Sequence, residues 1–224
     1  MRVKICGLFR DEDAAYANEA LPDYAGFVFA PQSRRYVSPA AAGKLRNRLS
    51  PAITTVGVFV DAPRGEIASL YRNGIIGMAQ LHGNENAAYL AELRACCDAP
   101  LIKAVSVARK GPLVGGEDAE AARLADYVLL DNGAGGTGKR FDWRGIPKAA
   151  ALLFPASAGT GASSVYAALT RKVFLAGGIG TGVMARAARY RPFAVDVSSG
   201  AESGGFKDRE KMLALVKAAH AFAP

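Results

Sequence analysis

Short apolar runs recur along the chain, and most of them are continuous rather than alternating. Eight such runs, rich in Val, Ile, Leu and Phe, are predicted to be strands: residues 2–6, 24–29, 53–60, 77–82, 100–105, 126–131, 172–177 and 193–198. A continuous apolar run suits a parallel strand whose sheet is buried on both faces. The pattern therefore predicts a buried parallel sheet.

Segments with helical periodicity lie between most of these runs. The clearest cover residues 11–20, 39–49, 62–72, 84–96, 117–124 and 208–222. Ser38 followed by Pro39 is a helix start signal, and Asn84 is predicted to cap the helix that follows it. Residues 147–171 contain a patch of small residues, which predicts a sixth helix that is broken or extended by a flexible insertion.

Strand and helix alternate along the whole chain. The mean step between strands is about 27 residues, which is enough for one crossover helix. This alternation is typical of an α/β protein with a single (β/α)8 barrel domain, here covering residues 1–224. An open doubly wound sheet is the alternative. It is disfavoured because a glycine-rich fingerprint is expected after its first strand, where only Gly7 stands.

Composition and charge narrow the class of function. Half of the residues are hydrophobic and the formal net charge is +8. A basic chain can bind nucleic acid, but here the Lys and Arg residues are dispersed and are not interleaved with aromatic residues. We therefore expect a cationic opening for small anionic metabolites and no nucleic-acid partner. No run of 18 apolar residues occurs, so no membrane association is expected.

Cysteine usage indicates the cellular compartment. The three cysteines are Cys6, Cys96 and Cys97, an odd number with two of them adjacent. This usage is typical of a reduced, cytoplasmic protein, and the first residues lack the apolar core of a signal peptide. No CxxC pair or His/Cys cluster is present, so we expect no metal site.

Polar residues stand at the carboxyl ends of several predicted strands, which form the functional face of such a barrel. Cys6, His82 and Asp131 each end a predicted strand, and Arg35 follows one closely. Each also has a structural interpretation: a small core residue, a structural histidine, a turn cap and a solvated basic turn, respectively. The glycine-rich residues 132–143 predict a mobile loop that could close over a ligand beside Asp131.

The last two predicted strands end in glycine and serine. Gly177 and Gly178 follow one strand, and Ser199 and Gly200 follow the next. In such barrels these two loops commonly bind phosphate through backbone N–H groups; glycine allows close approach and serine adds a donor. The pair of loops predicts a phosphate site, and the alternative is two ordinary tight turns.

Together these motifs resemble the phosphoribosylanthranilate isomerase family. The matching pieces run through almost the whole chain in order: KICG at 4–7, GFVF at 26–29, SRRY at 33–36, VGVF at 56–59, QLHG at 80–83, LLD at 129–131, GGTG at 135–138, FDW at 141–143, AGG at 176–178, RPFAVDVSSGAE at 191–202 and KD at 207–208. Two features depart from the family pattern. IGTGVM at 179–184 lacks its Asn-Val pair, and the sixth helix region is longer.

The resemblance implies a (β/α)8 barrel that catalyses an Amadori rearrangement of N-(5′-phosphoribosyl)anthranilate in tryptophan biosynthesis. It implies that Asp131 is the general acid that protonates the ring oxygen. It implies that Cys6 is the general base that removes the proton from C2′. Near neutral pH these roles need a raised pKa at Asp131 and a lowered pKa at Cys6.

Binding roles also follow from the resemblance. Arg35 is similar to the residue that engages the substrate carboxylate, and His82 and Asp196 are expected to line the opening. The residues expected to hold the phosphate are Gly177, Gly178, Ser199 and Gly200. The implied partner is a small phosphosugar, without a cofactor because the rearrangement is internal and net-neutral. The chain is expected to be a monomer or a homodimer.

Two other classes of function stay open. The first is another phosphate-binding barrel, such as a histidine-pathway sugar isomerase, an indole-glycerol-phosphate synthase or an aldolase-like lyase. Such enzymes would use two facing aspartates, or a strand-end lysine with a glutamate. Cys6 stands where the second aspartate is expected, and Lys4 and Lys103 are the lysine candidates. The second is a binding module without activity, which is disfavoured because both proton-transfer residues are present.

Overall fold

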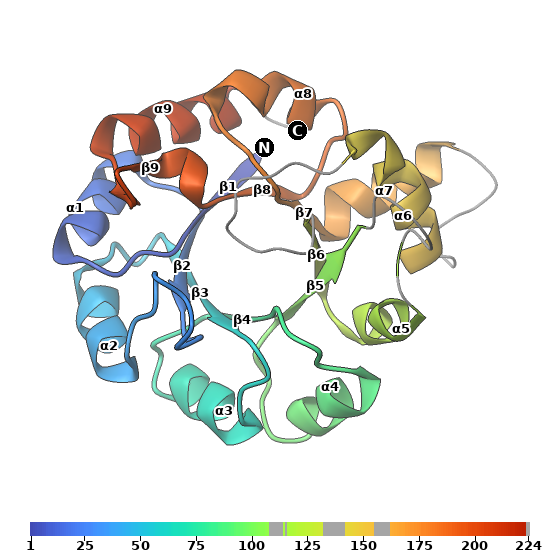
Figure 1. Ribbon diagram of the computed structural model, residues 1–224, viewed down its shortest axis with the longest axis horizontal. Helices are drawn as coiled ribbons and strands as arrows, with labels where there is room; N and C mark the ends of the chain where they lie inside the picture. The colour runs from blue at the N-terminus through green and yellow to red at the C-terminus, as the bar shows by residue number, and fades with distance from the viewer. Residues whose placement is uncertain (108–113, 115, 132–141, 155–161, 223–224) are drawn as a thin grey trace.

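The structure, a computed structural model, describes residues 1–107, 114, 116–131, 142–154 and 162–222. Eight parallel strands form a closed barrel surrounded by helices (Figure 1). Each strand pairs with the next one along the chain, and the last pairs with the first. Since closure leaves no edge strand, the predicted (β/α)8 barrel is confirmed and the open doubly wound sheet is wrong.

All eight predicted strands are present at their predicted places. They are β1 (Arg2–Cys6), β2 (Tyr24–Val28), β3 (Thr54–Phe59), β4 (Met78–Leu81), β5 (Leu101–Ser106), β6 (Tyr127–Asp131), β7 (Val173–Leu175) and β8 (Ala194–Val197). Their carboxyl ends share one end of the barrel because all of the barrel pairings are parallel.

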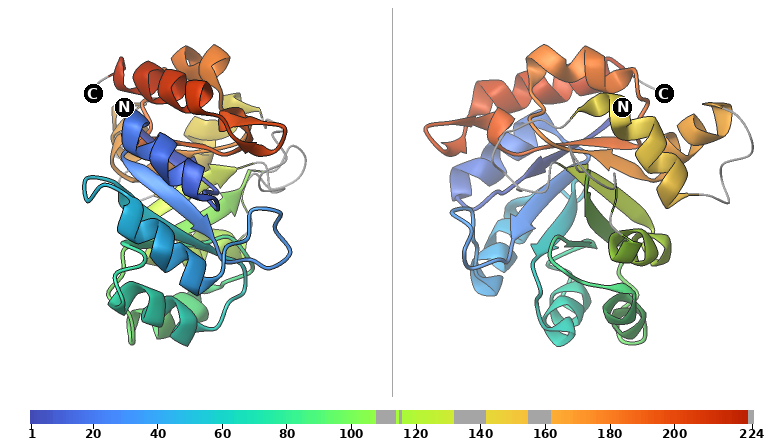
Figure 2. Two further views of the ribbon diagram at one scale, coloured as in Figure 1. Left: turned by 90° about the vertical axis from the view of Figure 1, so that its left-hand side faces the viewer. Right: turned by 45° about the vertical axis from the view of Figure 1, so that its right-hand side comes forward.

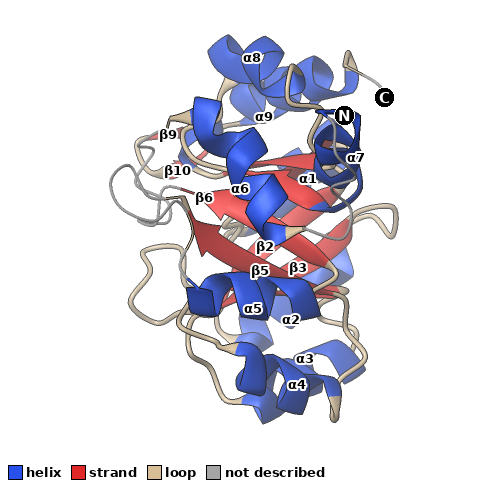
Figure 3. Cartoon of the chain, turned by 90° about the vertical axis from the view of Figure 1, so that its right-hand side faces the viewer, coloured by secondary structure: helices blue, strands red, loops and turns tan. Residues whose placement is uncertain are grey.

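Helices cover the outside of the barrel (Figure 3). They are α1 (Asp11–Ala20), α2 (Pro39–Arg48), α3 (Arg64–Arg72), α4 (Ala87–Arg94), α5 (Gly116–Leu124), α6 (Ile146–Leu153), α7 (Ala162–Lys172), α8 (Met184–Ala188) and α9 (Arg209–His220). Single 3₁₀ turns are η1 (Trp143–Gly145), η2 (Thr181–Val183) and η3 (Ser199–Ala201). A short antiparallel hairpin, β9 (Glu202–Ser203) and β10 (Phe206–Lys207), precedes α9.

Alternate residues of each strand face the helices and the barrel interior. In β1, Val3 and Ile5 belong to the core beneath the helices, whereas Cys6 packs inside with Val28 and Val58. A separate interior cluster fills the amino-terminal half of the barrel. It contains Val56, Met78, Ile102, Leu129, Phe174, Ala176 and Ala194. The interior positions nearer the carboxyl ends are therefore the ones left for polar side chains.

The sequence predicted the start of two helices from their capping residues, Ser38 and Asn84. Ser38 accepts a hydrogen bond from the Ala41 amide, and Pro39 is the first helical residue, as predicted. The predicted cap Asn84 is wrong, because Asn86 caps α4 through a hydrogen bond from the Tyr89 amide. Asn84 instead donates to Asp61, so a tertiary contact displaces the helix start by two residues.

The described residues of the irregular region 147–171 lie almost entirely in two helices. The region spans most of α6 and α7, so the predicted break in the sixth helix is confirmed. Residues 155–161, where the predicted insertion falls, lie outside the described residues, as do residues 132–141 of the predicted mobile loop.

The first and last described residues, Met1 and Phe222, meet at the amino-terminal end of the barrel, away from the strand carboxyl ends (Figure 2). The Met1 ammonium group donates a hydrogen bond to the carbonyl of Phe222. Within the described part of the chain, no helix has the length and apolar character to cross a membrane.

Candidate active site

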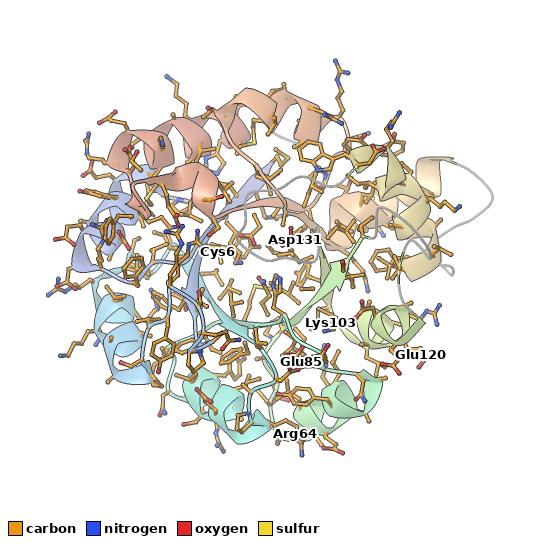
Figure 4. The ribbon with its side chains drawn as sticks, in the orientation of Figure 1. Cys6, Arg64, Glu85, Lys103, Glu120 and Asp131 are labelled. Atoms are coloured by element: carbon orange, nitrogen blue, oxygen red, sulfur yellow. The ribbon has the colours of Figure 1, made fainter. Side chains whose placement is uncertain are left out.

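Cys6 and Asp131 face one opening from two walls of the barrel. Each is the last residue of its strand, β1 and β6, and each is buried. Figure 4 shows both side chains within the ring of strands, Cys6 on the β1 side and Asp131 on the β6 side. Because an eight-stranded barrel is just wide enough for its own side chains or for one small ligand, a ligand in this opening would lie close to both groups.

The environment of Cys6 opposes ionisation of its thiol. Burial raises the pKa of Cys6, with Asp196 acting in the same direction, while Lys4 and Lys207 act to lower it. The two ammonium groups favour the thiolate, but loss of hydration outweighs them in the free protein, so the pKa of the thiol is raised.

Lys4 and Asp196 form a buried ion pair below Cys6. They are register partners across β1 and β8, and Nζ lies 3.1 Å from Oδ2. Burial acts against the charge of Lys4, but Asp196 and Cys6 outweigh it and raise its pKa. A lysine held as an ammonium ion is a poor nucleophile, which disfavours Lys4 as a Schiff-base residue. Asp196, expected to line the opening, lies one inward position deeper than Cys6.

His82 lies beside Asp131. The His82 Nε2 atom is 3.9 Å from Asp131 Oδ2, and its Nδ1 atom is 2.8 Å from the Gln80 amide nitrogen. Burial lowers the pKa of His82, although Asp131 acts to raise it. A neutral imidazole therefore stands next to the predicted general acid.

Lys103 is not in the opening. Its Nζ atom lies 3.0 Å from Glu85 Oε2 and 2.7 Å from the Gly83 carbonyl oxygen, with both side chains buried. Figure 4 shows Lys103 and Glu85 together on the α4 side of the barrel wall. Glu85 also accepts hydrogen bonds from the amides of Asp61 and Gly83, so this pair orders the loop after β4. Lys103 is therefore not placed to form a Schiff base with a ligand in the barrel.

Arg35 is held by Glu202, which was not among the site residues predicted from the sequence. Its Nε and Nη2 atoms lie 2.7 and 3.0 Å from the two carboxylate oxygens. Lys207 and Arg34 bond the same carboxylate, so three cationic side chains share one negative charge. A guanidinium group has five N–H donors in a fixed fork. Arg35 uses only its Nε and Nη2 atoms toward Glu202. The edge of Arg35 formed by Nη1 and Nη2 therefore keeps N–H donors for a second carboxylate.

The two loops predicted to bind phosphate lie against each other. Gly177 and Gly178 have φ values of 84° and 67°, which L side chains rarely adopt. A Cβ atom at Gly200 would lie 2.0 Å from the carbonyl oxygen of Ile179, so only glycine fits there. Ser199 begins the turn η3 in the second loop. The structure thus joins the four predicted residues at the ends of β7 and β8.

Comparison with known proteins agrees with this geometry. The family model described as N-(5′-phosphoribosyl)anthranilate (PRA) isomerase matches residues 3–218. The chain belongs to this family. A relative from Pseudomonas syringae pv. tomato with the name N-(5′-phosphoribosyl)anthranilate isomerase is 40% identical over 232 residues, covering 98% of each chain.

Solved structures of family members share the fold of this chain. The crystal structure of phosphoribosyl anthranilate isomerase from Thermus thermophilus is 33% identical, with a TM-score of 0.77 over 100% of both chains. A second isomerase structure is a complex with reduced 1-(o-carboxyphenylamino)-1-deoxyribulose 5-phosphate. It is 31% identical, with a TM-score of 0.74 over 99% of both chains.

Three polar residues of this isomerase-family site were not selected from sequence: Gln80, Glu202 and Lys207. Gln80 and Glu202 lie within the matched motifs QLHG and RPFAVDVSSGAE, and Lys207 begins KD. All three are buried. Gln80 could have been found from the sequence, because it is a polar residue inside an otherwise apolar strand. A buried polar group needs a hydrogen-bond partner, so such a residue indicates a polar contact in the barrel.

Glu202 and the three cationic side chains bonded to it, Arg34, Arg35 and Lys207, form a cationic cluster. The charge of Glu202 makes the stability of this cluster depend on pH. Burial acts to raise the pKa of Glu202, but the hydrogen bonds from Arg35 and Lys207 outweigh it and lower the pKa to about 2. The folded-state pKa lies below the unfolded value. The stabilisation is therefore complete above about pH 4.5 and is lost as the pH falls through about 2.

The Glu202→Gln variant is expected to unfold with a free energy about 3 kcal/mol lower than the unchanged protein at pH 7. At pH 3 the difference is expected to be about half as large, because the carboxyl group is then partly protonated in the unfolded reference. Urea titrations between pH 3 and pH 7 measure both values. Glu210→Gln, the same change at an exposed site, is the control and should shift little. A difference that does not depend on pH would contradict the assignment.

Proposed function

We propose that this protein converts N-(5′-phosphoribosyl)anthranilate into 1-(2-carboxyphenylamino)-1-deoxyribulose 5-phosphate, with Asp131 as general acid and Cys6 as general base. One observation carries the proposal. An acid and a thiol end β6 and β1 and face one opening, between a cationic cluster around Arg35 and the glycine loops after β7 and β8. Membership of the isomerase family supports the choice of substrate.

The first step opens the ribose ring. Asp131 donates its proton to the ring oxygen while the anthranilate nitrogen supplies its lone pair to C1′. The bond from C1′ to the ring oxygen breaks, leaving a hydroxyl group on the sugar and a protonated Schiff base. Without a proton donor the leaving group would be an alkoxide, so a positioned acid lowers this barrier by general acid catalysis.

The second step moves a proton from carbon. The iminium acidifies C2′–H, and the Cys6 thiolate removes that proton while the electron pair moves to the nitrogen. The resulting enolamine then tautomerises to the ketone. The positive iminium beside Cys6 also favours the thiolate, which offsets the burial that raises the pKa of the free thiol.

The ends of the substrate fit the charges around the opening. The anthranilate carboxylate would lie on the edge of Arg35 that Glu202 does not use. The phosphate would lie between Gly177, Gly178, Ser199 and Gly200, where backbone N–H groups and a serine hydroxyl can donate. His82 would donate a hydrogen bond toward the ribose from beside Asp131. Asp196 would contribute indirectly from beneath the opening, through its ion pair with Lys4.

A lysine-dependent lyase is less compatible with the site. Lys4 is ion-paired with Asp196, and Lys103 lies on the helix side of the barrel wall. Lys4 is held as an ammonium ion, and Lys103 does not face the opening. A pair of facing aspartates would need a carboxylate at the end of β1, where Cys6 stands.

The isomerase function can be tested with purified protein and with cells. Incubation with N-(5′-phosphoribosyl)anthranilate should cause loss of the anthranilate-type fluorescence, and expression should restore growth without tryptophan in a strain that lacks this isomerase. The same protein should not turn over histidine-pathway aminoimidazole sugars at a comparable rate. Failure of both the fluorescence change and the growth rescue would reject the function.

A further inference from the structure

Two buried side chains, Lys4 and Gln80, form a row with the partly exposed His82 beneath the barrel opening. Lys4 Nζ lies 2.7 Å from Gln80 Oε1, and Gln80 Nε2 lies 2.8 Å from His82 Nδ1. Lys4 comes from β1, whereas Gln80 and His82 lie on β4 and directly after it. The row leads to His82 Nε2, which is 3.9 Å from Asp131 Oδ2.

The hydrogen bonds in this row have only one possible direction. An ammonium group is a donor without acceptor capacity, so the oxygen of the Gln80 amide must face Lys4. The NH₂ group of the amide then faces His82 and can only donate. His82 Nδ1 must therefore be the acceptor, and the single proton of a neutral imidazole must lie on Nε2.

We propose that Lys4 and Gln80 are positioning residues that hold His82 as its neutral Nε2–H tautomer, so that Nε2–H is a donor toward Asp131 and the sugar oxygen it protonates. This inference deepens the proposed function and rests on it. The distance of 3.9 Å is longer than a hydrogen bond, so the Nε2–H donor strengthens only when the two groups approach.

The neutral form of His82 matters because it stands beside a general acid. An imidazolium ion would favour the carboxylate form of Asp131 before the reaction and remove the proton that the first step needs. A neutral N–H donor has a smaller effect on the ground state. It gains strength as negative charge develops on Asp131 during proton transfer, which is when stabilisation lowers the barrier.

The surroundings of His82 agree with the neutral form. Burial lowers its pKa most strongly, and the charges of Lys4 and Lys103 act in the same direction. The carboxylates of Asp131 and Asp196 act to raise it. The balance is a lowered pKa, while the row of hydrogen bonds selects which nitrogen carries the proton.

The tautomer can be measured directly, without an activity assay. Nitrogen-15 NMR of histidine-labelled protein distinguishes protonated from unprotonated ring nitrogens, and the chain has only two histidines. His82 should show a protonated Nε2 and an unprotonated Nδ1 at pH 7. His220, which pairs with Asp23 at the other end of the barrel, is the internal reference. A protonated Nδ1 at His82, in either the neutral or the charged ring, would overturn the proposal.

The Gln80→Glu variant replaces the amide donor with an acceptor of almost the same shape. His82 should then protonate Nδ1, and kcat should fall about 100-fold, the cost of losing one transition-state donor. Gln32→Glu, the same change at an exposed residue, should leave the His82 signals unchanged. An unprotonated Nδ1 in folded Gln80→Glu would overturn the proposal.

If Gln80→Glu does not fold, Gln80→Met removes the donor without adding a buried charge, and both neutral tautomers of His82 should then be present. A single Nε2–H tautomer in that variant would count against the role of Gln80. These results are separable from the proposed function. An active wild-type isomerase with the wrong His82 tautomer rejects only this inference, whereas an inactive wild type rejects the isomerase itself.

Discussion

The Asp131→Asn variant is expected to lose about 100- to 10,000-fold in kcat with little change in KM. Asparagine keeps the size and hydrogen-bonding capacity of the side chain but has no proton that it can transfer to the ring oxygen. Ring opening would then expel an alkoxide, or depend on water. Initial rates of fluorescence loss measure the effect, and circular dichroism checks that the barrel is intact.

Asp126→Asn is the matched control for this experiment. Asp126 immediately precedes the same strand, β6, at its amino-terminal end, where it accepts hydrogen bonds from Arg94 and the Leu101 amide. Its loss should affect stability and leave kcat within about 2-fold, because the opening lies at the other end of the strand. Wild-type kcat in folded Asp131→Asn would remove the general acid from the mechanism.

The Cys6→Ser variant is expected to lose a similar factor, about 100- to 10,000-fold in kcat. A serine hydroxyl ionises far less readily than a thiol, so the group that removes the C2′ proton would be lost while the side-chain shape is kept. Cys97→Ser makes the same change at another buried cysteine, which packs in the core beneath the helices, and should leave kcat unchanged.

The pH profiles of the unchanged enzyme extend this test. Only the thiolate is a base, so activity should rise with pH as Cys6 ionises. Burial raises the pKa of Cys6 in the free protein, so the rising limb of kcat/KM should lie above the ordinary thiol value of about 8.5. The rising limb of kcat should lie at lower pH than that of kcat/KM. In the enzyme–substrate complex the positive iminium favours the thiolate and so lowers the pKa of Cys6. A kcat/KM that does not change with pH between 7 and 10 would contradict Cys6 as the base.

Much of the fold was predictable from the sequence for a physical reason. A strand buried on both faces needs apolar side chains at nearly every position, and the eight continuous runs met that requirement in order. The carboxyl ends of parallel strands share one end of a barrel, so Cys6, His82 and Asp131 could be placed at one opening from the sequence alone. The pattern of apolar residues does not show what these side chains do; their expected catalytic and binding roles came from the family motifs.

The helix boundary at α4 shows where local signals were insufficient. Two asparagines, Asn84 and Asn86, stand two residues apart, and both are good caps. The choice between them was made by Asp61, which binds Asn84, and by the buried pair of Lys103 and Glu85. These partners come from other loops and strands, so a local capping rule could not select the residue.

The sequence by itself determined the barrel, the order of its strands and the chemistry at their ends, because those depend on apolar periodicity and on which residue ends each run. Only the tertiary structure decided which polar groups pair. Lys4 meets Gln80 across 76 positions, Arg35 meets Glu202 across 167, and Lys4 meets Asp196 across 192. Closure of the barrel also buries Cys6 enough to raise the pKa of its thiol. Desolvation and long-range pairing arise only when the strands are brought side by side.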